Sequence, residues 1–323
     1  MELVINPPQS VFDQLVHLSG TTHQWDHQPY DYQFYSMAYD GYWFIAMVDT
    51  NSTSNFVSGG SLARWDDKNG DPLYSIGLYY TKEEYRGQGY GKPVFKAMMD
   101  IVGGANCVLT AAVDMSQKYA DVFGFNKMPA YWHLEAEVLP GKMRTPELSG
   151  KYITKVSEGE EKKDLEAKDP NLNWKGVDLD LLNAYDLSIC PRTRKNYMKL
   201  WFQQNEVYTR IAFDSAQKIV GYCTIRVLCF NRLCAAPFYA ENEEIAARLL
   251  ADVVKEIPNF EKFEKLFFWY PAVNDKMEGL LNRFLPTDGY SIQVEFRTQF
   301  TKKLIPSRDD VVYSVACGTH QFV

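Results

Sequence analysis

Hydrophobic and polar positions along this chain follow two patterns, and each predicts one kind of secondary structure. In the first half, short runs rich in aromatic, β-branched and leucine residues predict strands. They are expected at residues 3–5, 43–48, 56–64, 73–80, 107–113 and 131–138. The clearest helix has apolar residues at the i, i+3, i+4 and i+7 positions of 95–102, and others are expected at 10–18 and 116–122. The first half thus predicts an α/β (mixed α+β) domain in which helices flank a twisted mixed sheet.

The second half predicts the same order of elements. A helix near 191–203 precedes three strands, a second helix with apolar residues on one face, and further strands and a helix. These later elements are expected at residues 207–213, 219–230, 233–239, 246–257, 265–270, 277–284, 292–300 and 311–317. Residues 157–169 are nearly all charged and predict an exposed linker, because they cannot bury much apolar area. The expected domains are 1–156 and 170–323, which suits a length of 323 residues.

Composition narrows the class of protein. The formal charge is −7, from 34 basic and 41 acidic residues, so nothing suggests a nucleic-acid surface. The N-terminus lacks the pattern of a signal peptide, and no apolar run is long enough to cross a membrane. Six scattered cysteines without a Cys-x-x-Cys pair are typical of reduced, buried thiols. We expect a cytoplasmic protein with no membrane partner, and the sequence does not predict its oligomeric state.

The most informative segment is the turn between the strand ending near residue 80 and the helix at 95–102. It contains Gly87, Gly89 and Gly91, with Arg86 before them and Lys92 after them. Glycines let a backbone approach a ligand closely, and a helix N-terminus presents N–H groups and a positive dipole end. The turn therefore predicts a binding site for phosphate or pyrophosphate.

The spacing of the glycines and of the lysine in this turn can be compared with the motifs of known phosphate-binding families. A Walker A loop needs Ser or Thr after its lysine, but Lys92 is followed by Pro93. The Rossmann fingerprint needs Gly-x-Gly-x-x-Gly, and the third glycine here comes one position too early. The Arg-x-x-Gly-x-Gly motif at Arg86, Gly89 and Gly91 instead resembles the pyrophosphate loop of the GNAT superfamily of acyl-CoA N-acyltransferases. The second half is similar, more loosely, to the C-terminal module of some tandem GNAT proteins.

This resemblance implies an N-acyltransferase, most simply one that moves an acetyl group from acetyl-CoA, its co-substrate, to the primary amine of a small molecule. It implies that one strand end and the glycine turn bind the cofactor, through Tyr79, Tyr80, Thr81, Arg86, Gly87, Gln88, Gly89, Tyr90, Gly91 and Lys92. The matching turn of the second half has Glu241, Glu243 and Glu244 and no glycine. Carboxylates there would repel a pyrophosphate, so we expect a single cofactor site, in the first half.

The catalytic residues are less well specified. In the family, a tyrosine four residues before a Gly-Phe pair often acts as the general acid. Counting back from Gly124 gives Ala120, and Tyr119 lies one position earlier, which is about 100° of helix rotation. Either Tyr119 protonates the leaving thiolate from a displaced helix, or another group does, or no group does. Asp114, Tyr79 and Tyr80 are further candidates for base or water-positioning roles, although Asp114 could equally belong to a helix N-terminus.

Two further features bear on the acceptor. An aromatic segment, with Asp26 and Asp31 nearby, would suit a cationic amine through cation–π and charge contacts, and core packing is the alternative. Its aromatic residues are Trp25, Tyr30, Tyr32, Phe34, Tyr35 and Tyr39. His23 and His27 have the i, i+4 spacing of metal ligands but no third partner, so no metal site is expected.

The alternative functions are a non-catalytic CoA-binding sensor, and a protein-lysine or N-terminal acetyltransferase with an open peptide groove.

Overall fold

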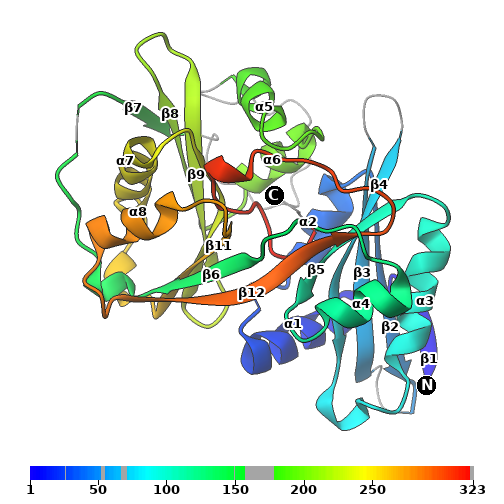
Figure 1. Cartoon of the computed structure of the whole chain (residues 1–323). Coiled ribbons are helices and arrows are strands. Elements are labelled where there is room, and N and C mark those ends of the chain that lie inside the picture. Colours follow the sequence, from blue (N-terminus) through cyan, green and yellow to red (C-terminus); the bar gives the residue numbers. More distant parts are fainter. Residues whose placement is uncertain (26, 52–54, 67–70, 149, 157–177, 321–323) are drawn as a thin grey trace. The chain divides into compact units, whose positions relative to one another are not determined.

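The computed structural model describes the chain except for residues 26, 52–54, 67–70, 149, 157–177 and 321–323. By their contacts, the described residues form two compact units (Figure 1). Unit 1 contains Met1–Pro129, Arg297–Leu304 and residues 318–320, and unit 2 contains Ala130–Phe296 and Ile305–Cys317. These units place residues 130–156 with the C-terminal half, whereas the sequence prediction placed them in the first domain. The predicted linker lies outside the described residues.

Unit 1 is built on a sheet in the order β1-β2-β3-β4-β5, followed by the end of β12. Its strands are β1 (Glu2–Ile5), β2 (Gly41–Asp49), β3 (Asn55–Asp66), β4 (Pro72–Thr81) and β5 (Asn106–Ala112). Its helices are α1 (Gln9–His23), α2 (Asp31–Ala38), α3 (Gly91–Val102) and α4 (Ser116–Phe123). The first strands pair antiparallel, and β4 pairs with β5 in parallel because α3 forms the crossover between them.

Alternation along β2 explains how helices cover both faces of this sheet. Ile45 belongs to the buried cluster that includes Phe95 of α3. Its neighbour Phe44 points to the other face, where its ring lies 5.2 Å from that of Phe12 in α1. Strands buried on both faces require near-continuous apolar sequence, which β2 has.

Unit 2 repeats this plan. Its sheet begins with the first residues of strand β12, which spans Tyr290–Phe300. The strand order is β12-β6-β11-β10-β9-β8-β7, and β13 pairs with β10. The other strands are β6 (His133–Val138), β7 (Ile153–Val156), β8 (Val207–Phe213), β9 (Ile219–Leu228), β10 (Arg232–Ala240), β11 (Lys265–Pro271) and β13 (Val312–Ser314). The helices are α5 (Leu179–Leu187), α6 (Lys195–Phe202), α7 (Glu243–Val254) and α8 (Lys276–Phe284). As in unit 1, an antiparallel series leads into a parallel pair, β10 and β11, through a crossover helix, α7.

Both units carry an irregularity at the same place in this plan. In β4 the register shifts opposite Gly60, and Leu78 takes a φ of +51°. In β10 the register shifts after Ala235, at the cis peptide bond between Ala236 and Pro237. A bulge of this kind bends its strand and changes which groups face the neighbouring strand.

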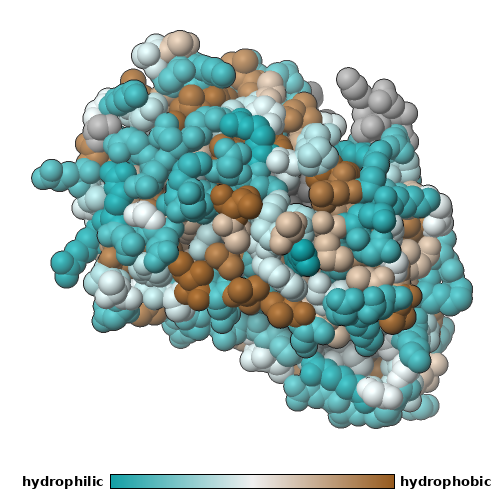
Figure 2. Space-filling view, viewed as in Figure 1, coloured by the Kyte–Doolittle hydropathy of each residue, from teal (hydrophilic) through white to brown (hydrophobic). Residues whose placement is uncertain are grey.

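The prediction of an α/β fold with mixed sheets is confirmed. None of the described helices is long and apolar enough to cross a membrane. Hydrophilic residues cover most of the face shown in Figure 2, and hydrophobic patches lie over β6 and the start of β12. Val294 of β12 is among the exposed large hydrophobic residues of this unit.

Candidate acyl-CoA site

The glycine turn of unit 1 lies where the sequence places it, between β4 and the N-terminus of α3. A short 3-10 turn, η1 (Glu83–Tyr85), leads into it. In the described part of the chain, no acceptor is present for the N–H groups of Gln88, Gly89, Tyr90 and Gly91. The N-terminus of α3 also has no side-chain cap. Donors left this way at a helix N-terminus bind an anion well, because the helix dipole adds to them.

The three glycines are needed for two different reasons. Gly87 and Gly89 have φ values of +76° and +87°, a region that other residues enter only with strain, although a Cβ there would meet nothing within 4 Å. Gly91 has an ordinary φ, but a Cβ there would lie 2.4 Å from the Tyr79 hydroxyl and 3.2 Å from Thr81 Oγ1. The first two shape the turn, and the third lets the end of β4 approach α3.

The end of β4 supplies a second element of the site. Pairing between β4 and β5 ends at Ile76 and Leu109, just before the bulge at Leu78. Beyond this point β4 continues to pair with β3, through Tyr80 and Thr81. The other backbone edge of residues 78–81 therefore faces away from β3 and, apart from the Thr81 carbonyl that accepts from Arg86, is available to a ligand. An extended ligand bound there would lead directly to the glycine turn.

Tyr79 and Tyr80 point to opposite faces of the sheet, as consecutive strand residues must. The Tyr79 hydroxyl lies beside Gly91, and burial raises the pKa of Tyr79 to about 12. Tyr80 instead packs against Trp25 and His23, with ring centroids 5.9 and 5.7 Å away. Only Tyr79 therefore lies on the α3 side with the glycine turn.

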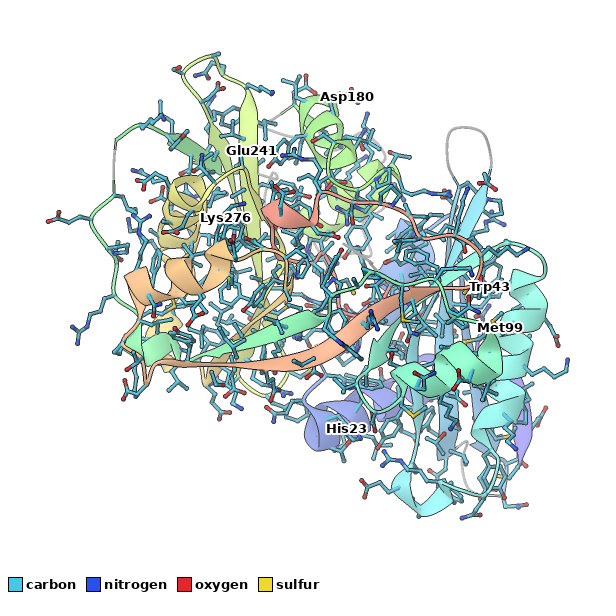
Figure 3. The ribbon with its side chains drawn as sticks, in the orientation of Figure 1. His23, Trp43, Met99, Asp180, Glu241 and Lys276 are labelled. Carbon is cyan, nitrogen blue, oxygen red and sulfur yellow. The ribbon has the colours of Figure 1, made fainter. Side chains whose placement is uncertain are left out.

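Arg86 is held by its own surroundings. Its Nε donates to the carbonyl oxygen of Thr81 at 3.0 Å, and its Nη2 lies 3.1 Å from Nε2 of His23, the last residue of α1 (Figure 3). Its guanidinium also lies over the Tyr80 ring and 3.5 Å from the carboxylate of Glu83. It remains 46% exposed, so it contributes charge near the turn while fixing the turn to β4 and α1.

Tyr119, Asp114 and Tyr79 lie near one another in unit 1. Burial raises the pKa of Tyr119, and the nearby Tyr79 and Asp114 raise it further. The ring of Tyr119 packs against Phe95, Phe123 and Phe125, with centroids 5.9 to 6.4 Å away. Asp114 is exposed in the turn between β5 and α4, and the N-cap position of α4 is Met115. A phenol with a raised pKa keeps its proton, which suits a general acid more than a base.

The aromatic segment is mostly core. Phe34, Tyr35 and Tyr39 are buried, and Trp25 is partly buried. Asp31 is fully buried and accepts a hydrogen bond from the Gln28 N–H, so its carboxylate serves the start of α2. Asp26 lies outside the described residues. No group of three or more potential metal ligands occurs in the described chain, and His23 contacts Arg86 instead.

In unit 2 the equivalent turn, before helix α7, has side-chain partners for its helix N-terminus. Asn242 caps α7, because its Oδ1 accepts the Ile245 N–H at 3.0 Å. Arg283 of α8 pairs with both Glu243 and Glu244. Side chains of unit 2 thus provide partners at the N-terminus of α7. At the N-terminus of α3, in unit 1, the backbone N–H donors have no acceptor in the described chain.

Two family models match the chain, one in each half. The acetyltransferase (GNAT) family matches residues 12–125, and an acetyltransferase (GNAT) domain matches residues 182–283. The chain is a tandem GNAT protein. Members of this family are acyl-CoA-dependent acyltransferases, and the glycine turn and β4 end of unit 1 fit the diphosphate and the extended arm of that co-substrate.

Solved structures agree on the fold across nearly the whole chain. A Pyrococcus horikoshii protein assigned to the acetyltransferases is 12% identical, with a TM-score of 0.67, and the match covers 98% of this chain and 95% of that one. A tandem GNAT protein from the clavulanic acid biosynthesis pathway is 11% identical, with a TM-score of 0.61 and coverages of 93% and 98%. A GCN5-related N-acetyltransferase from Sphaerobacter thermophilus is 11% identical, with a TM-score of 0.57 and coverages of 95% and 97%. No curated protein matches the chain significantly.

Sequence reasoning missed one set of residues near this site. Thr319 and His320, close to the end of the chain, belong to unit 1 and are buried against β3 and β4. They are more than 240 residues from Leu78 in sequence. They are two adjacent polar residues that follow Gly318, and no apolar alternation in the sequence marks them as part of a sheet.

Proposed function

We propose that this protein is an N-acetyltransferase that moves the acetyl group of acetyl-CoA to the primary amine of a small-molecule acceptor. The observation that carries this proposal is the turn at residues 87–91, which leaves N–H donors without acceptors at the uncapped start of α3. The net charge of −7 suits a cationic acceptor.

In this proposal acetyl-CoA supplies the activated acyl group, and the chain supplies orientation and electrostatics. The donors of residues 88–91 hold the diphosphate, and the free backbone edge of residues 78–81 directs the thioester end towards the bulge. In this proposal a main-chain N–H at the bulge stabilises the oxyanion that forms when an amine attacks. Such donors stabilise the oxyanion most strongly in a site from which water is excluded, because the dielectric constant is lower there.

Proton transfer is assigned to Tyr119 as the general acid. It is buried near Tyr79 and Asp114, and its raised pKa keeps the phenol protonated, so that it can donate to the departing thiolate. Asp114 is the nearby carboxylate that could accept a proton from the incoming ammonium, because it is exposed to solvent at the end of β5.

A release assay for free CoA thiol, run with acetyl-CoA over a panel of small amines and a lysine peptide, tests this function. We expect turnover with a small amine. Tyr119→Phe should then lower kcat by about 10²-fold or more, with little change in the Kd for CoA. Binding of CoA by calorimetry without turnover on any amine would instead support the non-catalytic CoA sensor. Turnover on the peptide alone would support a protein acetyltransferase.

The sensor has one observation in its favour. The Tyr119 ring packs among three phenylalanines, as a residue kept only for packing would do. The kinetic comparison of Tyr119→Phe with wild type distinguishes the acetyltransferase from the sensor, because the hydroxyl is the only group removed.

A further inference from the structure

The last described residues of the chain, 318–320, lie in unit 1 where β4 and β5 stop pairing. The last paired residues are Ile76 and Leu109. At the next position of β5, Thr110 Oγ1 donates to the carbonyl oxygen of Gly318 at 2.9 Å. At the next position of β4, a Cβ on Gly77 would lie 2.2 Å from Thr319 Cγ2. The segment therefore contacts both strands at the residue before the bulge.

His320 fixes this segment to the sheet. It is fully buried, and its Nδ1 lies 3.1 Å from the carbonyl oxygen of Ser75. A carbonyl can only accept, so Nδ1 carries the proton and donates it there. Nε2 then accepts from the hydroxyl of Ser61, 2.9 Å away on β3. The His320 ring also packs edge-on against Tyr35 of α2, with centroids 5.3 Å apart.

Thr319 contributes a hydroxyl on the same side of the sheet. Its Oγ1 lies 3.1 Å from Nε2 of His27, and His27 Nδ1 lies 3.7 Å from a carboxylate oxygen of Asp31. All three side chains are at most 5% exposed. The Thr319 methyl group is the side-chain atom that meets Gly77, and its hydroxyl faces His27. A buried row of carboxylate, imidazole and hydroxyl is costly to maintain for packing alone, since apolar residues would fill the same space without desolvation.

We propose that residues 318–320 form the acceptor side of the acyl-transfer site in unit 1, with Thr319 and His320 as positioning residues for the incoming amine. The segment contacts β4 and β5 where their pairing ends, and its Thr319 completes a polar row, Asp31–His27–Thr319, on the α1 and α2 face of the sheet. Tyr79 and the glycine turn lie on the α3 face. Cofactor and acceptor thus meet at the bulge from opposite faces. This inference rests on the proposed function.

The test compares variants of the full chain in steady-state kinetics with acetyl-CoA and the best amine of the panel. Thr319→Val removes the hydroxyl at nearly constant volume. We expect kcat/KM for the amine to fall by about 10- to 100-fold, while the Kd for CoA stays within about 2-fold of wild type. Thr319→Ser should restore the amine kinetics to within about 3-fold, because it restores the hydroxyl.

Thr301→Val is the matched control. Thr301 also belongs to unit 1, and its Oγ1 accepts the Cys107 N–H at 3.0 Å, near the start of β5 and away from the bulge. The variant loses a partly buried hydroxyl that accepts a backbone N–H, so we expect a lower thermal midpoint with unchanged amine kinetics. Ser61→Ala, which removes one of the two hydrogen bonds of the His320 ring and leaves Thr319 intact, provides a second variant should Thr319→Val not fold. It should show the same split between amine and CoA.

Each outcome decides one proposal. If Thr319→Val and Thr301→Val change the amine kinetics equally, or if Thr319→Val weakens CoA and amine alike, the segment only stabilises the fold and the inference is wrong. If wild type acetylates no amine, the proposed function fails and the inference fails with it. Turnover by wild type with unchanged kinetics in the Thr319 and Ser61 variants overturns the inference alone.

Discussion

The two units share one plan and use their polar groups in opposite ways. In unit 1 the crossover helix α3 starts without a side-chain cap, after a turn whose N–H groups have no acceptor in the described chain. In unit 2 the crossover helix α7 starts with an Asn242 cap and carboxylates paired with Arg283. A helix N-terminus that its own side chains satisfy has little left for a phosphate.

The same contrast recurs beyond each bulge. In unit 2, β10 and β11 stop pairing at Cys234 and Phe267, and β13 then lies between them. It pairs with β10 at Phe238, and the Val315 N–H donates to the Trp269 carbonyl of β11 at 2.8 Å. The strand edge that is free in unit 1 is therefore covered by backbone in unit 2.

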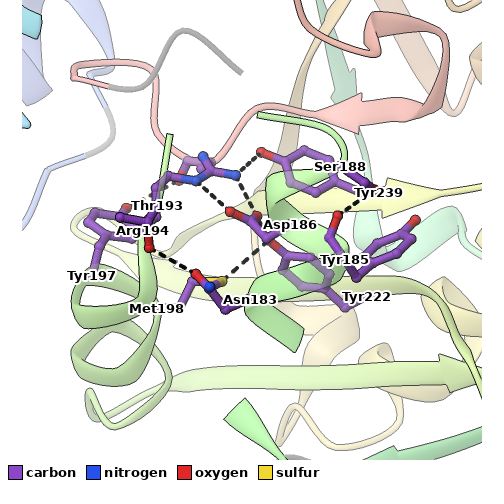
Figure 4. Close-up of polar contacts among 11 residues, drawn as sticks. Asn183, Tyr185, Asp186, Ser188, Thr193, Arg194, Tyr197, Met198, Tyr222 and Tyr239 are labelled. Atoms are coloured by element: carbon purple, nitrogen blue, oxygen red, sulfur yellow. Dashed lines mark hydrogen bonds and ion pairs between the residues drawn. The ribbon is translucent and has the colours of Figure 1, made fainter. Parts of the chain in front are cut away.

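Unit 2 also carries a buried polar cluster on its α5 and α6 side (Figure 4). Asp186 accepts from Arg194 at 2.6 and 3.0 Å and from the Tyr222 hydroxyl at 2.5 Å, and Arg194 donates to the Tyr239 hydroxyl at 3.0 Å. Burial raises the pKa of Tyr222, and the carboxylate of Asp186 raises it further. The comparison teaches that one fold plan can leave backbone donors without partners in one unit and satisfy the equivalent groups with side chains in the other.

The largest effect is expected from breaking this cluster. Asp186→Ala leaves the Arg194 guanidinium buried without its carboxylate, which should cost about 3–5 kcal/mol of unfolding free energy. Urea unfolding measures it. Asp180→Ala, which removes the exposed partner of Lys195, is the control and should cost at most about 1 kcal/mol. Equal losses in the two variants would mean that the cluster is not what stabilises unit 2.

The site in unit 1 is tested by Gly89→Glu. The substitution puts a side chain and a negative charge at the proposed diphosphate position, so the Kd for CoA should rise by about 100-fold or more, or about 2.7 kcal/mol. Calorimetry measures it.

Gly103→Glu is the matched control for this variant. Gly103 also has a positive φ, +57°, with nothing within 4 Å of a Cβ, but it follows the C-terminus of α3. Strain at both positions should lower stability by about 1–3 kcal/mol, so only the effect on CoA should differ. Unchanged affinity in Gly89→Glu would place the cofactor elsewhere.

Buried histidines give both units a pH dependence. Burial lowers the pKa of His320 in unit 1 and of His133 in unit 2 to about 3. Since the ordinary value is about 6.5, the unfolded chain binds more protons below that pH. The contribution of each neutral histidine to the free energy of unfolding is fully present above pH 6.5. It is lost as the pH drops towards 3, and about 2 kcal/mol per histidine is lost at pH 5.

Unfolding of wild type, His320→Gln and His133→Gln at pH 7 and pH 5 checks this sign. Each variant should lose less stability than wild type over that interval. If acid destabilises both variants as much as wild type, the two imidazoles are not held neutral by burial.

The smallest effect is expected at the cap of α7. Asn242→Ala removes the side-chain acceptor for the Ile245 N–H and should cost about 1 kcal/mol. The Kd for CoA should stay within about 2-fold of wild type, because the cap lies in the unit that binds no cofactor in this proposal. Thermal unfolding and calorimetry measure the two quantities, and a weakened Kd for CoA would contradict a single site in unit 1.

The sequence predicted the strands and helices that carry the glycine turn to within a few residues. Residues 73–80 and 207–213 fall within or coincide with β4 and β8, since their β-rich composition acts locally. The expected helix at 191–203 is shorter, as α6 runs from Lys195 to Phe202, and the expected strand at 311–317 is regular only in β13. Arg194, the N-cap residue of α6, pairs with Asp186 before the helix begins, and the regular part of the later segment is the part that pairs with β10.

Site residues were harder to place from the sequence than elements. The pair Tyr79 and Tyr80 looked equivalent, but alternation along β4 sends one to α3 and the other to Trp25. Arg86 looked like a free cation, but it is held by Thr81 and His23. These outcomes depend on side-chain contacts across the fold, which no local pattern encodes.

The sequence by itself determined the α/β repeat, the glycine-rich turn and its absence from the second half, because glycine spacing and carboxylates at a helix start act within a few residues. Only the tertiary structure decided that residues 318–320 pack beside Gly77 and that β13 covers the equivalent strand edge in unit 2. Those contacts join positions more than 70 residues apart in unit 2 and more than 240 in unit 1. Such contacts depend on how distant segments pack, so no local pattern predicts them.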